Sequence, residues 1–481
     1  MAKVIHVDLF GKRTEKYDFL GADRSRLHPS VSLSPSSPFF LFTCSDQHAG
    51  IEFEAFRSIT DVLPLCSLGL LTKRDDLLVG FGPEDVWNKV DHFLDSRVSD
   101  VVIAKEFGLP LRDKDRWDLS KARKQARAEH KRQVIAGLTY RPFDNRSIYY
   151  TNTLVARTNR RVLSNLNKVN SGLVLGRQGA AVGTPVWDVV FCTNELIDQN
   201  AFRRGGSTVF PLHIYPTREE AAMGVEKKPN FNPQFLDEVV GAIARSFNKS
   251  TLIPENAMPF IDGGPLVEPA QPTLESFGDA LGADQGSLES APKSVEETSE
   301  PTFTPEDVFH YIYAVLHSPT YRRRYAEFLK IDFPRIPLPG GPEVFDVLVP
   351  LGGDLVAMHL MESPRLNEPM TTFIGQGAPQ VEKVSYTDQT VWINKDQTKG
   401  FQGVPESVWN FYIGGYQVCE KWLKDRAPKK GKPGRTLTPE DIDHYQRIVV
   451  ALSETIRIMA EIDKAIEAHG GWPGAFQGAG Q

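Results

Sequence analysis

The sequence predicts an α+β protein in which a mixed N-terminal part is followed by a largely helical C-terminal part. In the first part, short apolar runs bounded by turn residues alternate with helical patterns. In the second part, two strong helix starts and one long apolar stripe dominate. Between them, residues 251–304 are acidic, rich in Pro and Gly, and without helical or strand periodicity, which is typical of a disordered linker. We therefore expect three parts: 1–250, a linker at 251–304, and a mainly helical domain at 305–475.

Strands in the N-terminal part are expected where four to six residues are mostly apolar and turn residues flank them. These runs are Val4–Leu9, Phe39–Phe42, Ser147–Tyr150, Gly172–Leu175 and Val186–Phe191. Helical patterns separate them at Pro83–Leu94 and Ser120–Ile135. The second helix is expected to start from Ser120 as N-cap, and it is basic over most of its surface.

Two helix starts in the C-terminal part share one pattern, in which Thr precedes Pro and two acidic residues. Thr caps the first turn, Pro suits its first position, and the acids suit the positive end of the helix dipole. The helix after Thr304 should end before Pro319. The helix after Thr438 carries nine apolar residues at spacings of three and four, which predicts packing against a partner helix. We also expect a helix over Pro405–Lys424 and strands within Gln380–Gly403.

The charge of the chain is unevenly distributed. The 481 residues carry 55 Lys+Arg against 61 Asp+Glu, a net charge of −6. Residues 112–161 hold fourteen Lys/Arg against five Asp/Glu, an excess of +9, whereas 251–304 hold ten Asp/Glu against one Lys, an excess of −9. The mean therefore excludes a uniformly basic protein, but it does not exclude one that meets nucleic acid with a single face.

Membrane and secretory signals are missing from the sequence. No apolar stretch reaches the ~18 residues that a membrane span needs, and the N-terminus has no apolar signal-peptide region. The four cysteines are too far apart for a zinc knuckle or a dense disulfide scaffold. These features favour a cytoplasmic protein without membrane contact.

The motifs of common catalytic sites are also missing. There is no GxxxxGK[ST] loop for nucleotide phosphates and no Asn/Asp-Pro-Pro-Tyr motif for a flipped adenine. The histidines have no metal-ligand spacing, and each is better explained as a surface or core residue. We expect no catalysis by this chain alone, no metal site and no bound cofactor.

Basic clusters interleaved with aromatic and amide side chains are the chemistry that the sequence does supply. Arginine can bind phosphate, or the O6/N7 edge of guanine, with two hydrogen bonds, and Asn or Gln can do the same to adenine. Taken singly, such a run is more often a solvated face, and Asp144 could simply pair with Arg141 or Arg146 and hold a turn. Because several clusters occur together, we expect DNA contacts, and for Arg177 and Gln178 contacts to base edges. The other candidates are Lys73, Arg74, Arg141, Asn145, Arg146, Arg157, Arg160, Arg161, Arg322 and Arg324.

At these residues the chain resembles a known family. Tyr-Arg-Pro-Phe-Asp-x-Arg-x-x-Tyr-Tyr at Tyr140–Tyr150, Arg177-Gln178 and Phe210–Pro216 are similar to the target-recognition region of bacterial adenine-specific DNA methyltransferases. More narrowly, with Tyr311–Pro319 and Trp409–Val418, they resemble the C-terminal specificity region of single-chain type ISP restriction–modification enzymes. The resemblance extends from about Val4 to Trp472.

This resemblance implies a sequence-specific module that binds double-stranded DNA in a bacterial restriction–modification system, a defence against phage. The family's complete enzymes combine a nuclease, an ATP-driven translocase, a methyltransferase and a target-recognition domain. Here His6–Tyr17 resembles the segment just beyond the methyltransferase core, so S-adenosylmethionine, ATP and Mg are expected only for a separate methyltransferase or helicase–nuclease polypeptide. Three alternatives stay open: a structural subunit that does not bind DNA, a decayed fragment of such an enzyme, and an enzyme with an unrecognised site.

Overall fold

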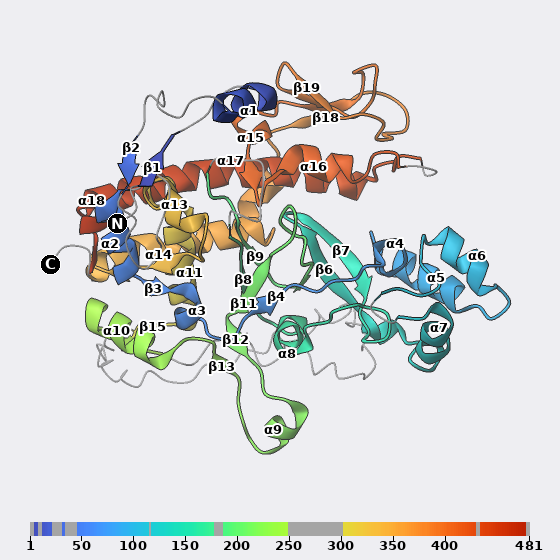
Figure 1. Ribbon diagram of the computed structural model, residues 1–481, viewed down its shortest axis with the longest axis horizontal. Coiled ribbons are helices and arrows are strands. Elements are labelled where there is room, and N and C mark those ends of the chain that lie inside the picture. Colours follow the sequence, from blue (N-terminus) through green and yellow to red (C-terminus); the bar gives the residue numbers. More distant parts are fainter. Residues whose placement is uncertain are drawn as a thin grey trace, which may run out of the picture.

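The computed structural model describes residues 4–7, 12–21, 31–33, 46–114, 117–177, 186–248, 302–429 and 433–477. The α+β organisation is confirmed: small sheets dominate before residue 248, and long helices follow residue 304 (Figure 1). The expected linker lies outside the described residues, except for its last three positions, where Thr302–Phe303 form strand β15.

Two four-stranded sheets form the centre of the N-terminal part. The first sheet has the order β10 (Leu196–Ile197), β6 (Ile135–Arg141), β7 (Asp144–Tyr149) and β5 (Val79–Gly80). The second has the order β4 (Ser67–Leu68), β11 (Thr208–Pro211), β8 (Gly172–Leu175) and β9 (Val190–Thr193). The backbone of Leu70 joins them, because its N–H donates to Ile197 at 2.8 Å and its carbonyl accepts from Gln199 at 2.7 Å.

Most of the strands expected from apolar runs are found, one with the expected ends and the others with shifted ends. Gly172–Leu175 is β8, and Ser147–Tyr150 overlaps the end of β7. The run from Val4 begins β1 (Val4–His6), which pairs with β2 (Val31–Leu33). Only the end of Val186–Phe191 is a strand, in β9. Phe39–Phe42 lies outside the described residues.

Helices α4 (Asp75–Leu78), α5 (Pro83–Leu94), α6 (Asp100–Glu106) and α7 (Leu119–Ala128) form a lobe at one end of the molecule (right in Figure 1). The predicted bounds of α5 are confirmed. Those of α7 are wrong at both ends: its N-cap is Asp118, whose side chain accepts from Lys121 N at 3.0 Å, and it ends at Ala128. The chain then passes through a short 3-10 turn at Arg132–Val134 into β6, because Ile135 pairs with Tyr149 in the sheet.

Three long helices carry the C-terminal part: α11 (Pro305–His317), α14 (Pro342–His359) and α17 (Pro439–Ala468). Both predicted starts are confirmed as capping boxes, in which Thr304 and Thr438 accept from Asp307 N and Asp441 N, each at 3.2 Å. Helix α14 crosses α11 at Gly352, where a Cβ would lie 1.9 Å from the carbonyl oxygen of His310. The absence of a side chain there sets the spacing of the two helices.

The single helix predicted over Pro405–Lys424 is wrong. Helices α15 (Glu406–Trp409) and α16 (Val418–Lys424) are separated by the two-stranded hairpin β22 (Tyr412–Ile413) and β23 (Tyr416–Gln417). Gly414 and Gly415 turn the hairpin with φ of 60° and 74°, a conformation that no helix continues through. The strands expected within Gln380–Gly403 are confirmed. They form one sheet in the order β18 (Thr372–Ile374), β21 (Gly400–Gln402), β20 (Thr390–Trp392), β19 (Ser385–Thr387).

The two parts share one hydrophobic core. Strand β3 (Arg57–Ser58) pairs with β16 (Arg335–Ile336) from the other part of the chain. In α2 (Gln47–Ala55), Phe53 packs against Tyr325 and Phe328, with ring centroids 5.4 and 5.3 Å apart. Within the C-terminal part, strand β17 (Leu338–Pro339) pairs with β24 (Phe476–Gln477). The N-terminal residues 47–58 are therefore part of the helical half by contact.

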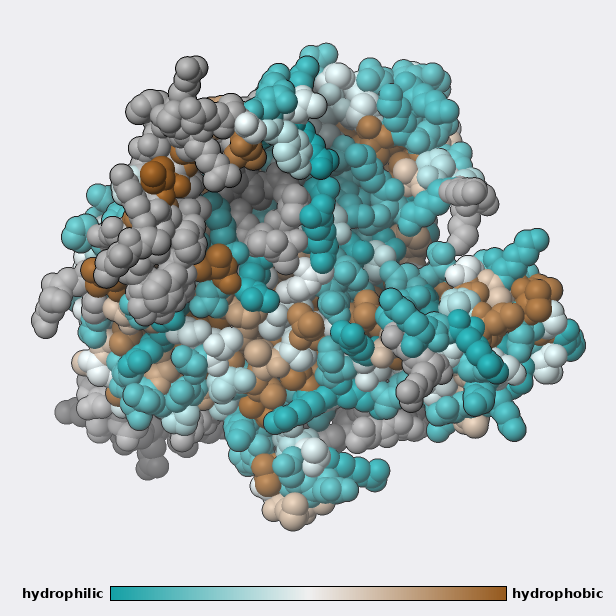
Figure 2. Space-filling model, viewed as in Figure 1, coloured by the Kyte–Doolittle hydropathy of each residue, from teal (hydrophilic) through white to brown (hydrophobic). Residues whose placement is uncertain are grey.

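Shorter elements complete the described fold. The helices are α1 (Arg13–Gly21), α3 (Ile59–Val62), α8 (Arg160–Leu163), α9 (Arg218–Ala222), α10 (Pro233–Ile243), α12 (Pro319–Arg324), α13 (Ala326–Leu329) and α18 (Gly471–Gly474). The strands are β12 (His213–Ile214), β13 (Lys228–Pro229) and β14 (Ser246–Phe247). None of the helices in the described part of the chain combines the length and apolarity of a membrane span. Figure 2 shows a face that is mostly hydrophilic, with hydrophobic residues in small separate patches.

Candidate nucleic-acid interface

The hairpin that joins β6 to β7 is inserted into the helical half. At its tip Phe143 has a left-handed backbone (φ 60°) and a buried ring. The ring packs against Phe191 and His359, with centroids 5.2 and 5.6 Å away. His444 Nε2 donates to the Phe143 carbonyl at 2.8 Å. The motif Tyr140–Tyr150 thus fixes the first sheet against α14 and α17.

Asp144 follows this tip and is buried between two arginines. Its carboxylate accepts from Arg146 Nη2 at 2.6 Å and from Arg426 Nη2 at 3.1 Å. Burial alone would raise the pKa of Asp144, but the guanidinium groups of Arg426 and Arg146 outweigh it and hold this pKa at about 2. Arg146 is therefore bound inside the chain, as the alternative interpretation of the sequence allowed.

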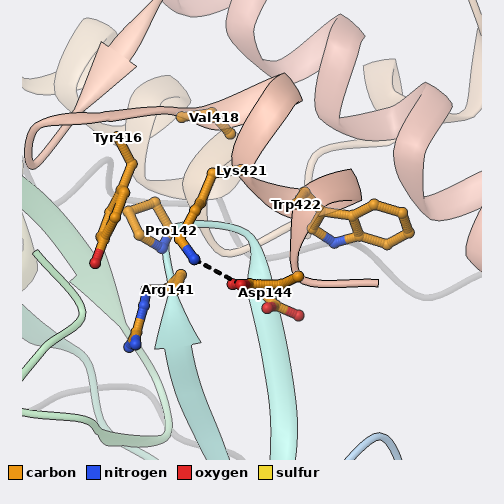
Figure 3. Close-up of a pocket in the computed structure, with 8 residues that line it drawn as sticks. Arg141, Pro142, Asp144, Tyr416, Val418, Lys421 and Trp422 are labelled. Carbon is orange, nitrogen blue, oxygen red and sulfur yellow. Dashed lines mark hydrogen bonds and ion pairs between the residues drawn. The ribbon is translucent and has the colours of Figure 1, made fainter. Parts of the chain in front are cut away.

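Arg141 lies next to this cluster and is also engaged within the chain. Its Nη1 is 3.2 Å from Asp198 Oδ1, and its guanidinium lies over the ring of Tyr140, 3.9 Å from the centroid. Figure 3 shows Arg141 beside Tyr416. Close by, Lys421 Nζ is paired with Asp425 Oδ1 at 2.6 Å. The cavity that these side chains line has a volume of about 10 Å³, room for one water molecule and far too little for a cofactor. In the described ranges, no three His, Cys, Asp or Glu side chains gather as a metal site.

Three further predicted arginines have their hydrogen bonds inside the protein. Arg74 is buried over the Trp117 ring and donates to the Leu154 carbonyl at 2.9 Å. Arg322 is buried and donates to the Leu316 carbonyl at 2.8 Å. Arg324 holds both carboxylate oxygens of Glu52, at 2.6 and 2.7 Å.

Other predicted residues are exposed. Arg157, Arg160, Arg161 and Arg177 are all exposed, and none has an acidic partner among the residues that the structure describes. The guanidinium groups of Arg160 and Arg177 lie over the rings of Tyr150 and Phe333, 5.5 and 5.9 Å from the centroids. Asn145 is exposed on β7, and Lys73 is exposed at a left-handed turn (φ 56°). Gln178 lies outside the described residues.

The exposed arginines belong to segments that adjoin one end of the second sheet. Leu68, Thr208, Leu175 and Val190 lie side by side in the last row of β4, β11, β8 and β9. Arg177 follows β8 at this end. The amide of Asn159, which precedes α8, donates to the carbonyls of Leu68 and Gly69 at 2.7 and 3.0 Å, so α8 adjoins the same end (Figure 1).

Two arginines at this end were missed by the sequence analysis. Arg203 and Arg204 lie in the connection from β10 to β11, and both are exposed without an acidic partner in the described part of the chain. The signal that could have found them is the run Arg-Arg-Gly-Gly between two apolar strands. With Arg157, Arg160, Arg161 and Arg177 they form what we call the arginine end of the sheet.

Residues 61–461 match the family model described as the Type ISP C-terminal specificity domain. The match covers most of the chain. The chain belongs to this family. No curated protein matches it significantly.

Solved structures share the fold of this specificity domain. A nuclease-deletion mutant of the Type ISP restriction-modification enzyme LlaGI, in complex with a DNA substrate mimic, is 17% identical with a TM-score of 0.57, over 93% of this chain and 32% of that chain. The ATP-dependent Type ISP enzyme LlaBIII bound to DNA is 16% identical, with a TM-score of 0.57 over 90% and 25%. The DrdV–DNA complex is 18% identical, with a TM-score of 0.60 over 94% and 42%. The specificity domain thus spans less than half the length of each of these chains.

Proposed function

We propose that the specificity domain recognises duplex DNA for a Type ISP-like restriction–modification or adenine methyltransferase system, and that it binds DNA with the arginine end of the sheet. The observation that carries this proposal is the gathering of six exposed arginines, with no acidic partner among the described residues, in a chain whose net charge is −6. Such a local excess is expected where a protein meets phosphates. The presence of DNA in the LlaGI, LlaBIII and DrdV structures supports it.

The arginines divide into two groups in this proposal. Arg157, Arg160 and Arg161, with Lys73, contact phosphates, and Arg177 contacts base edges. The same contact is expected of Gln178, which lies outside the described residues. The arginines engaged within the chain, Arg74, Arg141, Arg146, Arg322 and Arg324, support the fold, because breaking a bonded guanidinium away to reach DNA would leave its partner uncompensated.

Methylation, ATP hydrolysis and DNA cleavage belong, in this proposal, to other parts of a longer assembly. S-adenosylmethionine, ATP and Mg would bind there, and the specificity domain would position that assembly over one adenine in the bacterial cytoplasm.

The salt dependence of DNA binding tests this proposal. Each neutralised phosphate contributes about 0.9 to the slope of log affinity against log salt concentration. Replacing Arg157, Arg160 and Arg161 together by Ala should therefore reduce the slope by about 3. Arg457→Ala is the matched control, because Arg457 is already paired with Glu454 and Glu461 on α17.

Two outcomes would contradict the proposal: no binding of duplex DNA by the purified chain at low salt, or an unchanged slope in the triple variant. Co-purification with a methyltransferase or translocase that leaves DNA specificity unaltered would instead favour a structural subunit.

A further inference from the structure

The connection between β10 and β11 contains an unusual run of backbone conformations. Arg204, Gly205 and Gly206 are all left-handed, with φ of 67°, 85° and 89°. Glycine adopts this region freely, whereas for arginine it is energetically unfavourable. Non-glycine residues held in such conformations cluster at functional sites, where the surrounding structure enforces them.

The surrounding structure holds this turn from several sides. Asp198 Oδ1 accepts from Asn200 N at 2.7 Å, and Ser207 Oγ accepts from Phe202 N at 2.9 Å. Arg203 N donates to the Gly414 carbonyl at 2.7 Å, which ties the turn to the β22–β23 hairpin. The Phe202 ring fills the space over Gly414, where a Cβ would lie 2.0 Å from the ring. The backbone of the turn is thereby fixed against both halves of the molecule.

The two guanidinium groups take no part in this network. Arg203 and Arg204 are exposed, and within the described ranges neither has a carboxylate partner. This contrasts with Arg141 and Arg146, which are bound to buried aspartates close by. A fixed backbone that exposes two arginines without carboxylate partners in the described ranges is suited to binding a ligand outside the chain.

We propose that the Arg203–Arg204 turn reads guanine in the major groove, with Arg204 making the bidentate contact to O6 and N7. This inference rests on the proposed function and adds the base that is recognised. A phosphate contact tolerates a mobile side chain, whereas a bidentate base contact needs donors placed within about 0.5 Å. Arginine is the residue whose planar fork matches the guanine edge, so a change to lysine is not conservative at such a contact.

The test uses the full chain and a duplex selected by it from a random library. Each G·C pair of the selected site is then exchanged for A·T, and affinities are compared. Arg204→Lys keeps the charge but loses the planar fork, so it should weaken discrimination at one G·C pair by about 10-fold or more. Arg457→Lys is the matched control on α17, outside the proposed interface; it should keep every base preference of the parent chain.

Arg204→Gly distinguishes a role of Arg204 in base recognition from a role in the stability of the fold. Glycine suits φ 67°, so its Tm should equal or exceed that of the parent chain, while discrimination at the same G·C pair is lost. A lower Tm for Arg204→Gly would show that Arg204 serves the fold and would overturn the inference. Unchanged base preference in Arg204→Lys, with DNA binding intact, would overturn it as well and leave the proposed function standing. Failure of the parent chain to bind any duplex would overturn both.

Discussion

Asp144 shows how much one buried carboxylate can do. It is 1% exposed and bonded to guanidinium groups from β7 and from the segment after α16. Charges taken out of water are tolerated only when their partners are in place. The pairing of Asp144 with Arg146 and Arg426 therefore holds the β6–β7 hairpin against the helical half.

Removing that charge should be costly. In Asp144→Asn, Arg146 and Arg426 stay buried without a full countercharge, so the free energy of unfolding should fall by about 3–5 kcal/mol. Urea unfolding measures this fall in the free energy of unfolding. The control is Asp346→Asn: Asp346 is exposed, so the loss of its pairing with Arg245 should cost at most about 1 kcal/mol. Equal effects of the two substitutions would contradict the role of Asp144.

The pH dependence of stability gives a second prediction for the parent chain and Asp144→Asn. The pKa of Asp144 is about 2 in the folded protein, below its ordinary value of about 3.9 in an unfolded chain. Its contribution to stability is therefore complete above about pH 4 and is lost as the pH falls through 2. The difference in unfolding free energy between parent and Asp144→Asn should narrow from pH 5 to pH 2. A constant difference over that range would exclude this titration.

Which arginines are engaged within the chain could not be predicted from the sequence. The basic clusters can be seen in the sequence. It also allows the pairing of Asp144 with Arg146, because these two residues are only two positions apart. Arg426 lies 282 positions from Asp144, and Glu52 lies 272 from Arg324, so no local pattern connects them. Arg157, Arg160, Arg161 and Arg177 stay predicted contacts, and Arg203 and Arg204 emerged only from their place at the sheet end.

At the scale of elements, local signals were sufficient for helix starts and insufficient for turns. Thr304 and Thr438 cap their helices with partners three residues away, which a sequence displays directly. The break inside Pro405–Lys424 depends on the packing of Gly414 against Phe202, a contact between distant segments. The aromatic residues there satisfied a helical pattern, and tertiary packing prevailed over it.

The crossing of α11 and α14 gives a prediction for two helical glycines. Gly352→Ala would place a Cβ 1.9 Å from the His310 carbonyl oxygen, so the helices must separate and stability should fall by about 1–3 kcal/mol or more. Gly241→Ala in α10 meets no atom within 4 Å and should stabilise by about 0.5–1 kcal/mol. Opposite signs of the change in Tm are expected. A neutral Gly352→Ala would show that the crossing can adjust.

On the scale of the whole molecule, the sequence predicts two folded parts, 1–250 and 305–475, on either side of a linker. In the structure these two parts share one hydrophobic core. The β3–β16 pair, the contacts of Phe53 and the inserted tip at Phe143 all join residues from opposite sides of the linker. The fold class followed from composition and periodicity. The contacts between the parts could not, because β3 has only two residues and carries no pattern of its own.

A shared core predicts cooperative unfolding. Hydrogen exchange of the native chain in rising urea should show β8 and α14 opening with the same free energy, because neither half keeps its core without the other. Peptides from both elements, followed by mass spectrometry, provide the measurement. If α14 stays protected at urea concentrations where β8 has opened, the halves are independent units.

The contact between Phe56 and Trp472, with ring centroids 6.4 Å apart, bears on how the protein is made. The ribosome delivers Trp472 416 residues after Phe56. At ~5–20 residues per second, the delay is on the order of half a minute. Phe53 and Phe56 first meet Tyr325 and Phe328, and the surface that buries them is complete only when Trp472 is added. We expect the nascent chain to need a chaperone over this helix until its C-terminal segment leaves the ribosome.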